Sequence, residues 1–545
     1  MSSRSGSYME KDRAAQINGG DPAIVVNGPF HQSDIDRMQR KLGRGHIQMS
    51  IAGTIGTGLF LGLGEILAAT GPLGMILIYI LVSSVVYATL ASLAEMTAFA
   101  PISGTFPHYA ARWVHPALGF AIGWNYFYNA AITVPAEITA CAVLIGFWDS
   151  NLNHTAIYIA VICILLFAIN LFGVRVFGHS EVFFATLKLM LLVGLIIGGI
   201  VVTSGGGPDH QRHGFQYWRN PGPMVSYLDA GNRGRFVGLL VAVVPAAFSM
   251  GGVELIAISA AETRNPRRNI IMAMRTILFR IIFFYILLVF ILGLLVPSND
   301  PALFHQCSRK ASTTGQSPFV LAFNRAGIQT LPSVINAVVL SSAFSSGNSL
   351  LYAASRILYG LAVRRQAPRI FAKCTASGTP WVAILAAGAF ALLSFLNVQS
   401  AAGEVFNWFV NLSTVGGLLG WGTMNLTYLR YYHGLRVQGI NPEGIYRSPL
   451  QPFAAMWGLF WVVFFILISG ISVFWSFNAS DFVAAYINLP IFAGLFLGFK
   501  IFKKTKMHPL KDLDFVTGIP TLEETEKDGA LVKDISIAGK IKELI

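Results

Sequence analysis

Two glycine-rich stretches are candidate chemical sites, because each interrupts a long apolar segment. The first reads GTIGTG over Gly53–Gly58, and the second reads FSMGGVE over Phe248–Glu254, shortly after Pro245. A glycine costs roughly 1 kcal/mol in a helix interior and permits backbone conformations closed to other residues. We therefore expect both helices to be broken at these stretches.

Broken helices expose the groups that bind an α-amino acid. Free N–H groups and the positive end of a half-helix can hold a carboxylate, and the freed carbonyls of Thr54, Phe248 and Gly251 can accept hydrogen bonds from an ammonium. A helix-packing motif, Gly58-x-x-x-Gly62, is an alternative explanation for the first stretch. A nucleotide-binding loop is disfavoured, because no strand precedes these glycines.

Lys188 is a candidate for proton coupling. It lies about eight residues into its apolar segment, at a depth similar to that of Gly53 in the first. An ammonium there could donate to the unwound backbone and to the hydroxyls of Ser345, Ser346 or Ser349, and it could be charged or neutral by turns. It would then stand where a sodium ion could otherwise sit. The alternative is that Lys188 extends to the membrane surface.

Several carboxylates also lie in apolar segments, where ionisable groups are costly. Glu254 follows the second glycine stretch and should face the cavity, with a role in substrate or proton handling. Glu137 is a second proton-coupling candidate. Glu95 lies near a helix end, where a structural role competes, and we interpret Glu65 and Glu181 as structural.

Phe248 lies one turn before the second break and could cover the bound substrate as an aromatic gate. Single aromatic residues in such a chain usually serve packing, so position is what favours Phe248. Trp124, Trp408 and Trp421 are expected to serve packing or the membrane interfaces.

The elements that hold these residues are membrane-spanning helices. Apolar residues form 54% of the 545-residue chain and charged residues 12%, about half the charged share of soluble domains. Apolar length and turn signals predict an all-α polytopic membrane protein with twelve spans. We place the spans near 47–70, 74–98, 118–148, 156–174, 180–203, 236–258, 271–296, 333–363, 381–399, 405–430, 454–476 and 482–502.

The charge pattern predicts the orientation. The net charge of +13 comes from basic clusters in alternate connecting segments and both tails, as the positive-inside rule requires of cytoplasmic faces. We therefore expect a cytoplasmic tail at 1–45, a transmembrane domain at 46–505 and a cytoplasmic tail at 506–545, with both tails disordered or loosely ordered. This placement argues against nucleic-acid binding.

At these motifs the chain resembles the fungal amino-acid permeases, the yeast amino-acid transporter family of the amino acid–polyamine–organocation superfamily. The resemblance runs from about Leu42 to Lys506. The matching segments are Gly53–Phe60, Ala69–Gly74, Glu95–Met96, Pro101–Gly104, Gly119–Tyr126, Ala261–Arg268 and Ala354–Ala362.

The resemblance implies a LeuT-type fold, with two inverted five-helix repeats, two further helices, and spans one and six broken. It also implies symport of amino acids with protons at the plasma membrane. Site residues carried over from the family are Gly56, Thr57 and Gly58 for the carboxylate, Thr54, Phe248 and Gly251 for the amine, and Lys188 in place of a sodium ion. Val253 stands where many members have threonine, which leaves side-chain selectivity open.

The sequence thus predicts a proton-coupled amino-acid importer of neutral or broad specificity that works by alternating access. We expect no cofactor, no metal and no enzymatic activity, since no nucleophile–base set and no metal-binding cluster is evident among the spans. The rival functions are an amino-acid exchanger or sodium-coupled carrier on the same fold, and a receptor that senses amino acids without moving them.

Overall fold

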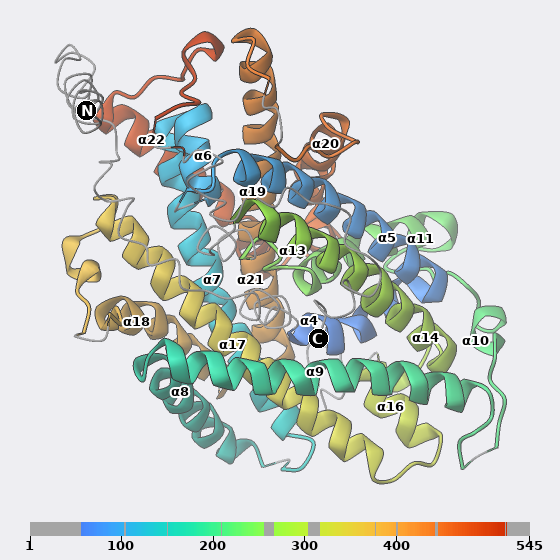
Figure 1. The fold of residues 1–545 in the computed structure, drawn as a ribbon. Coiled ribbons are helices and arrows are strands. Elements are labelled where there is room, and N and C mark those ends of the chain that lie inside the picture. The colour runs from blue at the N-terminus through green and yellow to red at the C-terminus, as the bar shows by residue number, and fades with distance from the viewer. Residues whose placement is uncertain are drawn as a thin grey trace, which may run out of the picture.

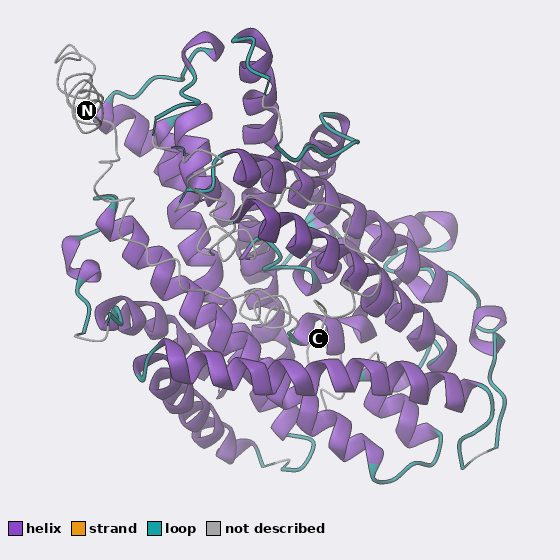
Figure 2. Ribbon diagram, in the orientation of Figure 1, coloured by secondary structure: helices purple, strands orange, loops and turns teal. Residues whose placement is uncertain are grey.

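The computed structural model describes residues 56–519 except 103–104, 150, 209, 256–265, 304–316, 376–377, 399–401, 442–444 and 518, and all regular structure in this part of the chain is helical (Figures 1 and 2). The longer helices are α5 (Gly62–Phe99), α7 (Pro116–Ile145), α8 (Thr155–Leu171), α9 (Val174–Thr203), α11 (Gly231–Ser249), α13 (Pro266–Arg280), α17 (Leu331–Val363), α19 (Ala402–Val437), α20 (Phe453–Ile468) and α22 (Asn488–Lys503). Shorter helical pieces are α4 (Thr57–Phe60), α6 (Thr105–Trp113), α10 (Gln216–Arg219), α14 (Leu287–Leu295), α16 (Pro318–Arg325), α18 (Trp381–Gly388) and α21 (Ala479–Tyr486).

Seven helices of the described chain are long and apolar enough to cross a bilayer, and the bent pair α21–α22 would make an eighth. Helices also occupy the other predicted spans, but these helices are too short or not apolar enough to be recognised as membrane-crossing by length and composition. The predicted span four is the 17-residue α8, span one is described only from Gly56, and span six ends early at Ser249. The structure therefore supports a polytopic membrane protein, and the count of twelve stays a prediction.

Helix α5 covers the end of the predicted span one and the whole of span two without an intervening loop. The chain changes direction at Gly71, where φ is +75°, and Pro72 opens the next segment. A side chain at Gly71 would meet the backbone of Pro223 at 2.9 Å, and Leu73 N–H donates to the Pro223 carbonyl at 2.9 Å. Only glycine combines this positive φ with so close a neighbour.

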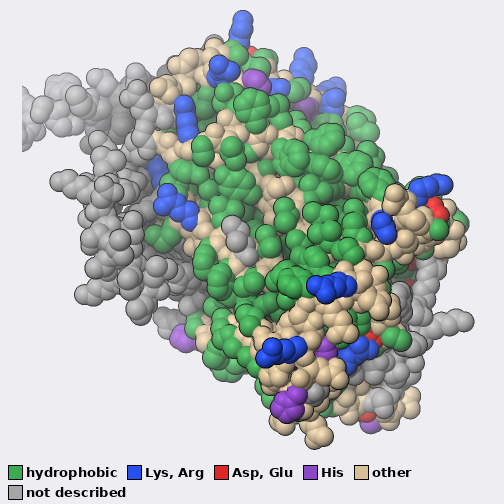
Figure 3. Space-filling model, turned by 90° about the vertical axis from the view of Figure 1, so that its right-hand side faces the viewer, with side chains coloured by type: hydrophobic (Ala, Val, Ile, Leu, Met, Phe, Trp, Pro, Cys, Tyr) green, Lys and Arg blue, Asp and Glu red, His purple; other side chains and the backbone are tan. Residues whose placement is uncertain are grey.

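The core is built around α7, which packs most extensively against α17 and α19, while α11 packs against α5. Elsewhere the helices turn large apolar side chains outward, among them Ile164, Phe183 and Phe460. Figure 3 shows, on one face of the molecule, a broad hydrophobic surface with Lys and Arg toward its margins. Such a surface fits lipid contact rather than water.

The segment after α22 differs from the prediction of a loosely ordered tail beginning at 506. Residues 507–517, here called the C-terminal strap, lie against the helical body. Phe515 is 6% exposed and its ring lies 5.8 Å from that of Trp113, while the Arg112 guanidinium pairs with the Asp514 carboxylate at 2.9 Å. The strap packs because two of its apolar residues, Leu513 and Phe515, become buried against the helical body.

Candidate functional site

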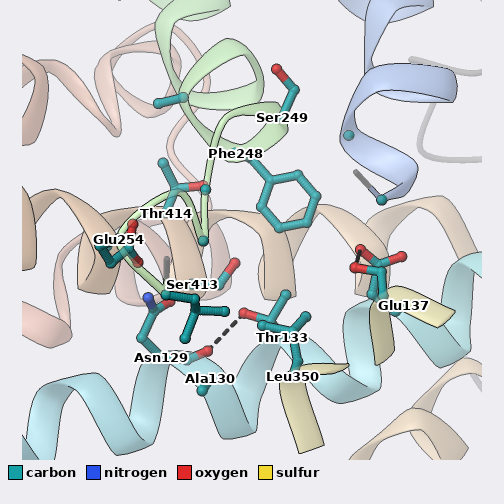
Figure 4. Close-up of a pocket in the computed structure, with 18 of the residues that line it drawn as sticks. Asn129, Ala130, Thr133, Glu137, Phe248, Ser249, Glu254, Leu350, Ser413 and Thr414 are labelled. Atoms are coloured by element: carbon teal, nitrogen blue, oxygen red, sulfur yellow. Dashed lines mark hydrogen bonds between the residues drawn. The ribbon is translucent and has the colours of Figure 1, made fainter. Parts of the chain in front are cut away.

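A pocket lies where the start of α4 and the end of α11 meet α7, α17 and α19 (Figure 4). The described end of the first glycine stretch and the break after Ser249 therefore open onto one cavity. Its lining residues are Gly56, Gly58, Tyr126, Asn129, Ala130, Thr133, Glu137, Ala247, Phe248, Ser249, Gly251, Gly252, Glu254, Leu255, Ser346, Ser349, Leu350, Ser413, Thr414, Gly417, Leu418 and Trp421.

Glu137 of α7 faces the first turn of α4. Thr57 N–H donates to Glu137 Oε2 at 3.4 Å, and the Ser346 hydroxyl of α17 donates to Glu137 Oε1 at 2.9 Å. A Cβ on Gly56 would lie 2.2 Å from Glu137 Oε1, so the carboxyl group rests directly on this glycine. One of the N–H groups predicted to bind a substrate carboxylate, that of Thr57, thus already contacts a carboxyl group of the protein.

The two broken helices touch at Gly58. A Cβ on Gly58 would lie 2.7 Å from Ser249 Cα and 2.8 Å from a ring carbon of Phe248. Phe248 lines the cavity, and in Figure 4 its ring lies between Glu137 and Glu254. Its placement fits the predicted gate position.

The second break follows Ser249. The Met250, Gly251 and Leu255 N–H groups make turn hydrogen bonds, the Gly251 one to the Phe248 carbonyl at 3.0 Å, and Gly252 has a φ of +79°. These turns replace the regular helical ladder, as the glycine pair predicted. Thr54, the third predicted amine ligand, lies outside the described residues.

Ser249 fixes the end of α11. Its hydroxyl lies 3.0 Å from that of Tyr79 in α5, and Tyr285 O–H donates to the Ser249 carbonyl at 3.1 Å. Tyr285 belongs to a π-helical segment, Ile281–Ile286. These hydroxyls satisfy backbone and side-chain groups that the broken helix leaves without intrahelical partners.

Glu254 is 3% exposed and accepts a hydrogen bond from Trp421 Nε1 of α19 at 3.2 Å. It lines the cavity as predicted. Trp421, which we interpreted as a packing residue, is also a polar partner of the site. An indole N–H usually finds an acceptor when it is buried, and this rule could have indicated from the sequence that Trp421 has a polar partner.

Lys188 of α9 is fully buried, so the structure does not support its extension to the membrane surface. The charged groups that act on its ammonium are Glu181, Glu137 and Arg280. Glu181 is 3% exposed and accepts a hydrogen bond from the Ser345 hydroxyl at 2.9 Å. Position near a helix end suggested a structural Glu181, whereas the structure buries it against Ser345 of α17 on the same helix as Lys188, with which it interacts electrostatically.

Glu95 lies away from the cavity. Tyr428 O–H donates to Glu95 Oε2 at 2.6 Å, and the backbone N–H of Ser448 donates to its other oxygen. This carboxyl group joins the end of α5 to α19 and to the segment that precedes α20. The arrangement matches the structural alternative for Glu95.

Sequence reasoning missed much of the polar lining. Asn129 and Thr133 of α7, and Ser413 and Thr414 of α19, all face the cavity. Two of the four side chains, Ser413 and Thr414, belong to a helix in which sequence reasoning found no candidate for substrate or proton binding. The Thr133 and Thr414 hydroxyls donate to carbonyls one turn earlier, at 2.7 and 2.6 Å, so polar side chains are accommodated within these spans.

Comparison with known proteins shows that the part of the chain that forms this site matches a known family. A family model described as "Amino acid permease" matches residues 45–511, which include every residue of the pocket and nearly all of the helical body.

Curated relatives match over almost their full length. A proline-specific permease of Emericella nidulans is 39% identical over 95% of each chain. Two permeases of Saccharomyces cerevisiae are also similar: a dicarboxylic amino acid permease (37% identity, covering 92% of this chain and 84% of the relative) and a lysine-specific permease (36%, 93% and 86%). The chain therefore belongs to the amino acid permease family, and it is a fungal-type amino acid transporter of the membrane.

Proposed function

We propose that this chain is a proton-coupled amino-acid importer that works by alternating access. The observation that carries the proposal is one cavity lined by Gly56 and Gly58 and by the turns after Ser249, with a buried carboxyl group at each side of Phe248 (Figure 4). Helix breaks supply backbone donors and acceptors for a zwitterion, while Glu137 and Glu254 supply groups that can carry a proton.

We propose a twelve-span LeuT-type architecture with inverted repeats as the frame for this transport. The break after Ser249 supports it, because it places the end of α11 at the cavity. We also propose that both termini lie in the cytoplasm, on the strength of the basic clusters in alternate connecting segments, and that the membrane is the plasma membrane, as the resemblance to the fungal amino-acid permeases implies.

Neutral or broad specificity is our proposal for the substrate. The lining residues include two carboxyl groups and no lysine or arginine within the described part of the chain, which disfavours a second substrate carboxylate. Both carboxyl groups already have hydrogen-bond partners in the protein, Ser346 and Thr57 for Glu137 and Trp421 for Glu254. They therefore do not need a cationic side chain of the substrate as a partner. The relatives named above carry the words proline, dicarboxylic and lysine, so the family spans several side-chain classes.

Uptake of a panel of radiolabelled amino acids into proteoliposomes, with and without an inward pH gradient, tests the proposal. We expect accumulation that needs the gradient and collapses with a protonophore. Accumulation driven by a sodium gradient would show the sodium-coupled rival instead, and strict one-for-one exchange the exchanger. Saturable binding without accumulation under any gradient would indicate a receptor.

A further inference from the structure

Four buried ionisable side chains lie at or near the cavity, and Lys188 interacts electrostatically with the other three. Lys188 is fully buried, and Glu137, Glu181 and Arg280 are 3%, 3% and 4% exposed. The two carboxylates and two cations sum to zero charge when all four are ionised. Because a lone charge in such a place is costly, each member depends on the others.

Consecutive hydroxyls of α17 hold the two carboxyl groups. Ser346 donates to Glu137 and Ser345 donates to Glu181, both at 2.9 Å. Neighbouring helix residues point about 100° apart, so α17 directs these two hydroxyls to carboxyl groups of two different helices, Glu137 of α7 and Glu181 of α9. Glu137 and Ser346 line the cavity, whereas Glu181 and Ser345 are absent from its described lining. Lys188 thus has one carboxyl group on the substrate side and one away from it.

The geometry of α9 directs Lys188 toward Glu181. The two residues are seven positions apart, which places them on one face about 10 Å apart along the axis. Side chains of a helix lean toward its N-terminus, so the Lys188 stem points toward Glu181. Glu181 lies between Lys188 and the first turn of α9, which begins at Val174. In the proposed topology that turn is at the cytoplasmic side.

An aromatic stack joins α9 to α17 on the side of Glu181 that faces the start of α9. The Phe177 ring, one turn before Glu181, stacks on the Tyr352 ring of α17 at 4.1 Å, and the Arg356 guanidinium covers Tyr352 at 4.5 Å. This stack lies on α9 between Glu181 and the first turn of the helix, which begins at Val174.

We propose that Glu181 is the release carboxyl group of a proton relay, Glu137 to Lys188 to Glu181, an inference that rests on the proposed proton coupling. Lys188 gives an ammonium proton to the Glu181 carboxylate, which forms the O–H bond of a carboxylic acid. The amine left on Lys188 takes the proton that Glu137 received in the cavity, and the Glu137 O–H bond breaks. Glu181 then gives its proton to water on the cytoplasmic side, so one proton has crossed and each group is restored.

The test compares net uptake with exchange in proteoliposomes that contain the full chain. Net proton-driven uptake needs proton release on every cycle, whereas exchange of external labelled for internal unlabelled amino acid does not. We expect Glu181→Gln to lower net uptake by about tenfold or more while exchange stays near the wild-type rate. Glu181→Asp should restore part of the net uptake, and Glu404→Gln, at the first turn of α19, should change neither rate.

The paired serines give a second readout. Ser345→Ala should lower net uptake without changing the half-saturation concentration, whereas Ser346→Ala, at the cavity, should change that concentration. Equal losses of net uptake and exchange in Glu181→Gln, or no loss of either, would overturn the relay while leaving the proposed function intact. A wild-type protein whose uptake ignores the pH gradient would overturn both together.

Discussion

At the scale of single residues, the contact between the broken helices depends on the absence of a side chain at Gly58. A methyl group there would meet Ser249 Cα at 2.7 Å and Ser249 N at 3.0 Å, and backbone cannot move aside as a flexible side chain can. We expect Gly58→Ala to separate α4 from α11, to lower stability by about 1–3 kcal/mol and to abolish uptake. Thermal unfolding in detergent and uptake in proteoliposomes measure the two effects.

Gly494→Ala is the matched control, since a Cβ at this exposed position of α22 meets no atom within 4 Å. It should leave both unfolding and uptake near wild type, because alanine is favoured over glycine in a helix. Wild-type uptake by Gly58→Ala would mean that the close approach has no part in transport.

Glu254 offers a second test at this scale. Trp421→Phe removes the indole N–H that donates to its carboxyl group at 3.2 Å, while keeping an aromatic ring in the wall of the cavity. Loss of a hydrogen bond to such a group costs about 1.5–3 kcal/mol. We expect the ratio of maximal uptake rate to half-saturation concentration to fall by about 10–100-fold.

The control for Trp421→Phe is Trp457→Phe. Trp457 also donates a hydrogen bond, to the Ser84 hydroxyl at 3.0 Å, but it is 46% exposed on the outer face of α20. It should leave transport kinetics unchanged. Equal kinetic effects from both substitutions would contradict a specific role for the Trp421–Glu254 pair.

At the scale of elements, local sequence predicts where helices run and where they break, but not what they meet. The predicted spans 118–148 and 333–363 agree with α7 and α17 within three residues, because apolar length is a local property. The break after Ser249 was equally readable, since glycine pairs act locally. The pairing of Glu181 with Ser345 could not be predicted in this way. The two residues are 164 positions apart, and their contact depends on how α9 packs on α17.

The short connection between α7 and α8 is held by one carboxylate. Asp149 accepts hydrogen bonds from Tyr158 O–H at 2.6 Å and from Asn151 N–H at 2.9 Å, and His154 Nδ1 lies 2.6 Å away. The Tyr158 hydrogen bond, followed by that from His154, lowers the pKa of Asp149 from 3.8 to about 2. A carboxylate with a depressed pKa stabilises the folded loop above its unfolded pKa, and the effect is lost as pH falls through the folded value.

We therefore expect this connection to keep its order in acidic medium. Hydrogen exchange at Asn151 should stay slow as the pH is lowered from 7 toward about 4 and rise only below that. Asp149→Ala should show fast exchange across the whole range. If the wild-type loop opened near pH 6, the Asp149 carboxylate would not be what holds it.

At the scale of the whole molecule, the C-terminal strap joins parts that lie far apart in the chain. The Phe515 ring lies 5.9 Å from those of Phe99 in α5 and Tyr431 in α19, and 5.8 Å from that of Trp113 in α6. The strap follows the last helix, yet it closes over the ends of helices from the first quarter of the sequence. Composition predicted a loose tail, because two buried apolar residues among many polar ones leave no periodic signal.

Burial of Phe515 should therefore stabilise the whole helical body rather than the tail alone. Phe515→Ala removes a ring that is 6% exposed and leaves a cavity among three aromatic neighbours, and such substitutions cost about 3–5 kcal/mol in a well-packed core. We expect a lower midpoint of thermal unfolding and faster hydrogen exchange at the ends of α5 and α19. The adjacent Val516 is 80% exposed, so Val516→Ala should change neither quantity. A Phe515→Ala protein that loses protection only within residues 507–517 would show that the strap rests on the body without supporting it.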